Sequence, residues 1–237
     1  MDIWNWISKF HSGRVEDFKT PAFAKDIRPY RRAYADALKF TKSLGYDTSL
    51  LSLNSDDTSL LAEDGDFLMN VAKSAEITQS VSHHAAAQCL KWSHYLKPFY
   101  EKELGKRVIL TTGQFWKRDQ CMFKPTFEDA KNWNKHGIQA KDFGNQGHGL
   151  KLHAWLTVES GEIIDPTLMS SFANIDFENY GKYSGYTVYG HADKVLNYCK
   201  YVPITVGSEV VEEMTRNFSS QLLATKPDEL KMKLIST

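Results

Sequence analysis

The stretch from residue 153 to residue 167, HAWLTVESGEIIDPT, constrains the fold more than any other part of the chain. Its polar and apolar residues alternate on both sides of Glu159-Ser160-Gly161, a pattern typical of two antiparallel strands joined by a three-residue loop. With that loop, Asp165 on the second strand lies diagonally across from His153, on the same face and roughly 7 Å away between backbones. A two-residue loop would place Asp165 on the opposite face. The pattern therefore predicts a hairpin that brings a histidine and a carboxylate together.

Cys89 lies upstream of this hairpin, so the chain carries a cysteine, a histidine and an aspartate in that order. These residue types can act as a nucleophile, its general base and the group that fixes the tautomer of the base. Each also has a plainer interpretation. Cys89 suits a small core position, His153 a half-buried strand position, and Asp165 an Asp-Pro turn that ends a strand.

The first 105 residues have mostly helical spacing. Apolar residues at helical intervals predict a helix within residues 22–44, with a break or kink near Pro29. Residues 47–57 are rich in Ser, Asn and Asp, which predicts a loop. Two further helices are predicted, one at 65–75 and one that starts near Ser82 and ends at Gly105.

Beyond Gly105 the pattern changes from helical spacing to alternation. Strands are predicted at 107–113, 150–159, 162–165, 186–189 and 198–206, and a closing helix at 208–224. Helices first and antiparallel strands afterwards indicate an α+β fold in which N-terminal helices pack on an antiparallel sheet. We expect a helical N-terminal region at 1–75 and a core at 76–237, together forming one compact domain.

Residues 115–149 separate two predicted strands and are long for an ordinary connection. The segment contains Trp116, Trp133 and the glycine-rich run at 144–149. Long loops of this kind often act as lids or as walls of a substrate site. We therefore expect this segment to be a long loop that acts as a lid or as a wall of the site.

The composition excludes several classes of partner. Lys plus Arg and Asp plus Glu both number 29, so the formal charge is zero, and we expect no nucleic-acid or membrane partner. The chain shows no signal peptide and no run of roughly 18 apolar residues, and its three cysteines fit a reducing compartment. These features favour a cytoplasmic location, with export by another signal left open. His83 and His84 lack further ligands at zinc-like spacing, so neither a metal nor a cofactor is expected.

Several short motifs follow one another in the order found in a known family: Cys89, Leu104-Gly105, Arg107-Val108, Gly113-Gln114-Phe115, His153-Ala154-Trp155 and Asp165-Pro166-Thr167. In this order and spacing the chain resembles the transglutaminase-like branch of the papain-like cysteine-enzyme superfamily. The resemblance covers residues 85–170 and is more specific in its His-to-Asp half. It implies a papain-like (transglutaminase-like) core with Cys89 as the nucleophile, His153 as the base and Asp165 as the group that orients the base.

The sequence departs from that family at two points. The family's cysteine begins its helix, whereas residues 83–88 before Cys89 have helical character; a helix that begins near Ala87 or Gln88 would restore the match. The second donor of an oxyanion hole has no clear counterpart. The candidates for that donor are Gln79, Gln88 and Gln114.

Three residues are candidates for contact with substrate: Trp155 beside the triad, and Trp116 and His148 in the long segment. Trp155 fits core packing equally well, and His148 also fits a solvated loop position.

The resemblance implies cysteine-dependent acyl chemistry on a peptide bond or carboxamide, with a protein or peptide as substrate. Water as the acyl acceptor would give a peptidase, amidase or deamidase, which we favour because no dedicated amine site is evident. An amine acceptor would give a transglutaminase, and a thioester donor an acyltransferase. A non-catalytic protein-binding module on the same fold is the rival class. An effector acting on a host protein has the same sequence features.

Overall fold

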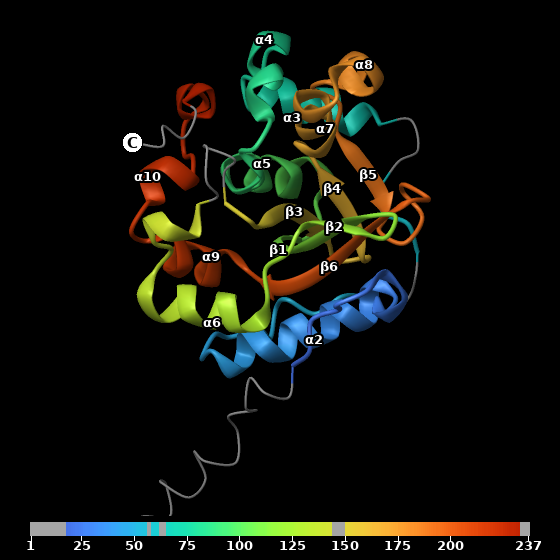
Figure 1. Ribbon diagram of the computed structural model, residues 1–237. Helices are drawn as coiled ribbons and strands as arrows, with labels where there is room; N and C mark the ends of the chain where they lie inside the picture. The colour runs from blue at the N-terminus through green and yellow to red at the C-terminus, as the bar shows by residue number, and fades with distance from the viewer. Residues whose placement is uncertain (1–17, 56–57, 62–64, 144–149, 233–237) are drawn as a thin grey trace, which may run out of the picture.

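The computed structural model describes residues 18–55, 58–61, 65–143 and 150–232 of the 237-residue chain (Figure 1). Helices cover both sides of a sheet whose strand pairs are all antiparallel. The α+β class predicted from the order of helical and alternating segments is confirmed.

The sheet is built from six strands: β1 (Val108–Lys117), β2 (Gln120–Phe123), β3 (His153–Val158), β4 (Glu162–Asp165), β5 (Val188–His191) and β6 (Cys199–Val206). Its order is β2-β1-β3-β4-β5, and β6 pairs with β1. β1 therefore lies at the centre of the sheet, and every residue from Val108 to Trp116 is buried.

Gly113 shows why the centre of the sheet needs a glycine. It pairs with His153 on β3 and with Pro203 on β6, where the β1–β6 register shifts by one residue. A Cβ atom at Gly113 would lie 2.0 Å from the backbone oxygen of Val202. Only a residue without a side chain allows β6 to approach the strand beside His153 this closely.

The α-helices are α2 (Tyr30–Ser43), α3 (Asp66–Ser74), α4 (Gln79–Ser82), α5 (Cys89–Leu104), α6 (Phe127–His136), α7 (Leu168–Ile175), α8 (Phe177–Tyr180), α9 (Ser208–Thr215) and α10 (Ser219–Leu222). The described residues also form five short 3₁₀ helices: η3 (Ala24–Asp26), η4 (His83–Ala85), η5 (Ala140–Asp142), η6 (Gly181–Tyr183) and η7 (Pro227–Lys231). No helix in the described ranges is both long enough and apolar enough to cross a membrane.

α2 and α5 lie on opposite faces of the sheet (Figure 1). α2 buries Tyr30, Tyr34 and Ala37 with Trp155 and other residues of one sheet face. α5 buries Leu96 and neighbouring apolar residues against the other face, which includes Ala154. The alternation along β3 therefore directs successive side chains into two different cores.

The predicted break at Pro29 is confirmed. η3 precedes it, and α2 begins at Tyr30, directly after the proline. Proline suits this boundary because it has no amide hydrogen to contribute to a helix.

The prediction that residues 115–149 form a long loop was wrong for their described part, although Phe123 of this segment does line the pocket described below. β1 continues to Lys117, β2 follows, and α6 occupies Phe127–His136. A capping box begins α6: the Asp129 amide donates to Thr126 Oγ1, and the Thr126 amide donates to Asp129 Oδ2. The Thr-x-x-Asp pattern was a usable helix signal. Residues 144–149 lie outside the described ranges.

Two other element predictions need correction. The closing helix predicted at 208–224 is divided into α9 and α10, separated by residues 216–218. The strand predicted at 186–189 is β5, which is displaced towards the C-terminus at Val188–His191.

Candidate active site

Cys89 is the first residue of α5, which corrects the predicted helix start near Ser82. The chain makes two short helical turns, α4 and η4, and then leaves helical geometry at Ala86, whose ψ is 132°, and at Ala87, whose φ is +60°. Gln88, the N-cap residue of α5, has φ −122° and ψ 33°. The alternative of a helix beginning beside Gln88 is the one that the structure shows.

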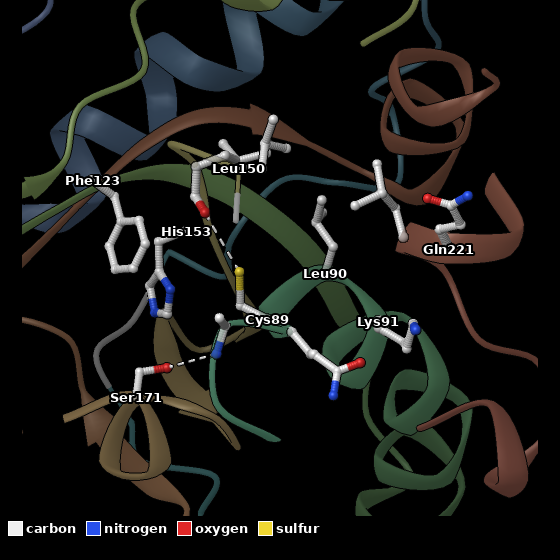
Figure 2. A pocket seen from close by; sticks show the side chains of 12 residues that line it. Cys89, Leu90, Lys91, Phe123, Leu150, His153, Ser171 and Gln221 are labelled. Carbon is white, nitrogen blue, oxygen red and sulfur yellow. Dashed lines mark hydrogen bonds between the residues drawn. The ribbon is translucent and has the colours of Figure 1, made fainter. Parts of the chain in front are cut away.

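Ala87 holds the sharp turn that presents Cys89. Left-handed backbone geometry costs an alanine about 1 kcal/mol. The Ala87 amide donates to Ser171 Oγ at 3.4 Å, so a residue of α7 supports the turn (Figure 2). The strained turn separates η4 from α5. It leaves Cys89 at the N-terminus of α5, which is the positive end of the helix dipole.

The hairpin has the predicted register. Leu156 pairs with Ile164 and Thr157 with Ile163, which requires the three-residue loop that ends at Gly161. Gly161 has φ +88°, a conformation that favours glycine. In this register His153 at the start of β3 and Asp165 at the end of β4 share a face and meet.

Asp165 is fully buried and receives donors on both oxygens. His153 Nε2 lies 2.6 Å from Oδ2, and the Tyr201 hydroxyl donates to the same oxygen at 3.1 Å. The Thr167 amide and hydroxyl and the Leu168 amide donate to Oδ1 at 3.0–3.1 Å. Burial alone would raise the pKa of Asp165, but the charge of His153 and these hydrogen bonds lower it below its usual range.

His153 is held among aromatic rings. Phe123 stacks on its imidazole at 5.1 Å between centroids, and Trp155 stacks at 5.9 Å. Phe115 meets the imidazole edge-on, and the Tyr201 ring lies tilted beside it with centroids 6.1 Å apart. This packing and the bond to Asp165 fix the ring in one orientation.

The second ring nitrogen of His153 is the free one. Nδ1 is buried and has no hydrogen-bond partner among the described residues. Burial lowers the pKa of His153, but the charge and hydrogen bond of Asp165 and the interaction with the Cys89 thiol raise it to about 10. The Cys89 thiol itself contacts the backbone oxygen of Leu152 at 3.5 Å. Figure 2 shows the Cys89 and His153 side chains beside each other at one pocket.

The raised pKa of His153 predicts a pH dependence of stability. His153 binds its proton more tightly in the folded protein than in the unfolded chain. The stabilisation that protonated His153 gives the folded state is therefore complete below about pH 6.5 and is lost as pH rises towards 10. We expect the difference in unfolding free energy between the wild type and His153→Gln to shrink from pH 7 to pH 10. Urea titrations across this range measure it, and other titrating groups cancel in the difference. A difference that stays constant or grows with pH would contradict the prediction.

The pocket in front of Cys89 is mostly apolar. Its apolar lining includes Leu90, Phe123, Leu150, Leu152 and Leu222. Its polar lining comes from Gln88, Lys91, His153, Ser171 and Gln221. The site therefore combines the Cys89 thiol with a small, largely apolar surface.

The three glutamines proposed as oxyanion donors are placed differently. Gln88 Nε2 donates to the backbone oxygens of His84 and Leu230, so its amide is already engaged. Gln114 is fully buried, donates to Pro125 O and accepts from Trp116 Nε1. Gln79 lies in α4, and its side chain is outside the described part. Neither described glutamine points a free amide donor at Cys89.

The two tryptophans that were proposed to contact substrate are buried. Trp155 has no exposed surface, and its indole donates to the Tyr30 hydroxyl at 2.8 Å, so it packs behind His153. Trp116 is also buried and does not line the pocket. His148 lies outside the described residues. The structure therefore gives the two tryptophans a packing position.

Sequence reasoning missed several residues at the pocket. Phe123 reaches it from β2, Ser171 from α7, and Gln221 and Leu222 from α10. None lies in a recognisable motif, because each is brought to Cys89 by the fold. Within the described ranges no group of three or more His, Cys, Asp or Glu residues has the geometry to hold a metal ion.

Comparisons of the chain with models of protein families, with characterised proteins and with solved structures found no match.

Proposed function

We propose that the protein is a thiol-dependent acyl-transfer enzyme with the triad Cys89, His153 and Asp165. The observation that carries the proposal is the buried His153–Asp165 pair, 2.6 Å apart, whose free Nδ1 lies beside the first residue of α5. A carboxylate that fixes a histidine, and a histidine beside a thiol, are the parts that a cysteine nucleophile needs.

The proposed reaction starts with attack of the Cys89 sulfur on a peptide or side-chain carboxamide carbon, with His153 holding the thiol proton. A C–S bond forms, and the carbonyl electrons move onto oxygen. When the carbon–nitrogen bond breaks, His153 gives its proton to the leaving amine. Water then attacks the thioester, releases the acid and regenerates the thiol. Asp165 keeps Nε2 occupied throughout, so that Nδ1 faces Cys89.

The start of α5 supplies donors for the oxyanion. Backbone amides in the first turn of a helix have no partner within the helix and carry partial positive charge. The proposed donor is the Cys89 amide, with a neighbouring first-turn amide beside it. This arrangement takes the place of the glutamines, whose described amides are engaged elsewhere. One preorganised donor of this kind is worth about 3 kcal/mol to the transition state.

The proposal also places the chain in the papain-like, transglutaminase-like architecture. Its support is a nucleophile at the start of α5 and a base and its orienting group on the paired strands β3 and β4. The sequence motifs that run from Cys89 to Asp165 support the same assignment.

Alkylation of the native protein tests the nucleophile. We expect iodoacetamide at neutral pH to label Cys89 at least about tenfold faster than the other two cysteines. Burial raises the pKa of Cys121 to about 11 and that of Cys199 to about 12, so both remain protonated thiols. Mass spectrometry of the digested protein identifies the labelled residue. Labelling of Cys89 only after unfolding would overturn the proposal.

A product screen then separates the reaction types. Peptides containing glutamine are incubated with the wild type or Cys89→Ser, with and without a fluorescent primary amine. Chain cleavage indicates a peptidase, a mass gain of about 1 Da a deamidase, and amine incorporation a transglutaminase. We expect hydrolytic products that depend on Cys89. Turnover that persists in Cys89→Ser would reject the triad.

A further inference from the structure

The charges around the catalytic pocket are one-sided. Two basic side chains, Lys91 and His153, line it, and no carboxylate does so among the described residues. Glu229 lies near Lys91, but its carboxylate accepts from the Thr225 and Lys226 amides and is not part of the lining. Asp165 lies 2.6 Å from His153 and offsets its charge, so a cation in this pocket would face Lys91 and lose water without gaining an unpaired counter-charge.

One side of the pocket is formed by the C-terminal wall, which we define as residues 221–232. Three polar side chains of α5 and its N-cap hold this wall through its backbone oxygens. Gln88 Nε2 donates to Leu230 O at 3.3 Å, and Lys91 Nζ donates to Met232 O at 2.7 Å. His94 Nδ1 lies 2.8 Å from Ala224 O.

Apolar packing fixes the same wall. Leu230 is fully buried and Leu222 is 4% exposed, and both belong to the core that contains Leu90 and Trp92 of α5. Because hydrogen bonds and packing both anchor the wall, the backbone that presents Gln221 and Leu222 to the pocket is held against α5. A fixed wall can select a substrate by shape and polarity.

Gln221 is the polar residue of the C-terminal wall that lines the pocket. It is exposed, it lines the pocket, and its side chain makes no hydrogen bond to the described residues. Figure 2 shows it across Cys89 from His153. A group bound at Cys89 therefore lies between His153 on one side and the wall on the other.

We infer that the pocket selects a peptide with an aliphatic side chain beside the attacked carbonyl and rejects a basic one, with Leu222 and Gln221 of the C-terminal wall as the selecting residues. This inference rests on the proposed function of Cys89. Leu90, Leu152 and Leu222 offer apolar contact, while the Lys91 ammonium disfavours a second ammonium group in the pocket.

Peptidyl chloromethyl ketones test the selection on the full-length protein. The Cys89 sulfur attacks the methylene carbon, a C–S bond forms, and chloride leaves. Two probes that differ only in leucine or lysine beside the ketone are compared, and each rate is divided by its rate with N-acetylcysteine. We expect the leucyl probe to alkylate Cys89 at least about tenfold faster than the lysyl probe.

Gln221→Glu adds the missing carboxylate at an exposed position, so its folding is not at risk. We expect it to raise the rate with the lysyl probe several-fold relative to the rate with the leucyl probe, so that the leucyl-to-lysyl rate ratio falls. Gln120→Glu introduces the same change at an exposed residue outside the lining and should leave the ratio as in the wild type.

Labelling with iodoacetamide distinguishes failure of the selection from failure of the proposed function, because this reagent measures thiol reactivity without a peptide. Rapid iodoacetamide labelling of Cys89 with equal leucyl and lysyl rates would overturn the selection and leave the proposed function standing. An unchanged ratio in Gln221→Glu would remove Gln221 from the selecting surface. Absence of preferential labelling by iodoacetamide would reject the proposed function, and the inference with it.

Discussion

Replacement of His153 by alanine is expected to lower turnover by about 10²- to 10⁴-fold, the usual contribution of a positioned general base, and to slow Cys89 alkylation at neutral pH at least about tenfold. The thiol remains in place at the start of α5, but no imidazole is left to hold its proton. Cys121 and Cys199 should label as slowly as before, because their burial does not depend on His153. Stopped-flow or quenched alkylation followed by mass spectrometry measures the three rates in one sample.

A matched substitution separates loss of the base from a general effect of removing histidine. His136 is exposed at the end of α6 and does not line the pocket, so His136→Ala should retain wild-type rates. Circular dichroism and a urea titration must show that His153→Ala is folded at the assay temperature. A folded His153→Ala protein with an unchanged Cys89 rate would exclude the histidine as base and with it the triad.

The His–Asp half of the site could be predicted from sequence because it is local. Strand alternation and the loop ending at Gly161 determine the register, and the register places Asp165 on the face of His153. The thirteen residues from His153 to Asp165 contain the whole arrangement. Short-range rules were therefore sufficient for this pair.

The position of Cys89 at the start of α5 could not be predicted from the sequence, because it depends on long-range contacts. The sequence 83–88 has helical propensity, yet the helix that carries Cys89 begins only after the turn at Ala87. The Ser171 hydroxyl that supports this turn is 84 residues away in sequence. No local pattern predicts a left-handed alanine, because its strain is compensated by tertiary contacts.

The C-terminal wall could not be predicted from the sequence, because its contacts with α5 are also long-range. Its contacts join α5 to residues about 140 positions later, as in the bonds from Gln88 to Leu230 O and from Lys91 to Met232 O. The acceptors are backbone oxygens, which every residue carries and which leave no mark on the sequence. Sequence patterns reveal side-chain chemistry more readily than the backbone that a side chain binds.

Replacement of Asp165 by alanine is expected to lower the unfolding free energy by about 3–5 kcal/mol at pH 7, the usual cost of removing one partner of a buried ion pair. His153 would lose its counter-charge, and the Thr167, Leu168 and Tyr201 donors would lose their common acceptor. Asp165→Asn keeps an acceptor of similar size, so it should cost less while still disturbing the orientation of His153. Urea titrations at pH 7 compare the variants, with Asp119→Ala at an exposed position as the control.

A double-mutant cycle shows whether the loss belongs to the pair. If the charge of His153 is the main reason that Asp165 is needed, the double variant His153→Ala/Asp165→Ala should lose less stability than the two single variants added together. The sign follows from the pKa shifts, since each partner favours the charged form of the other. Strict additivity would mean that Asp165 stabilises the fold through the Thr167, Leu168 and Tyr201 bonds alone. In that case the carboxylate would anchor the end of β4 and the start of α7, and its influence on Cys89 would be limited to placing the imidazole ring.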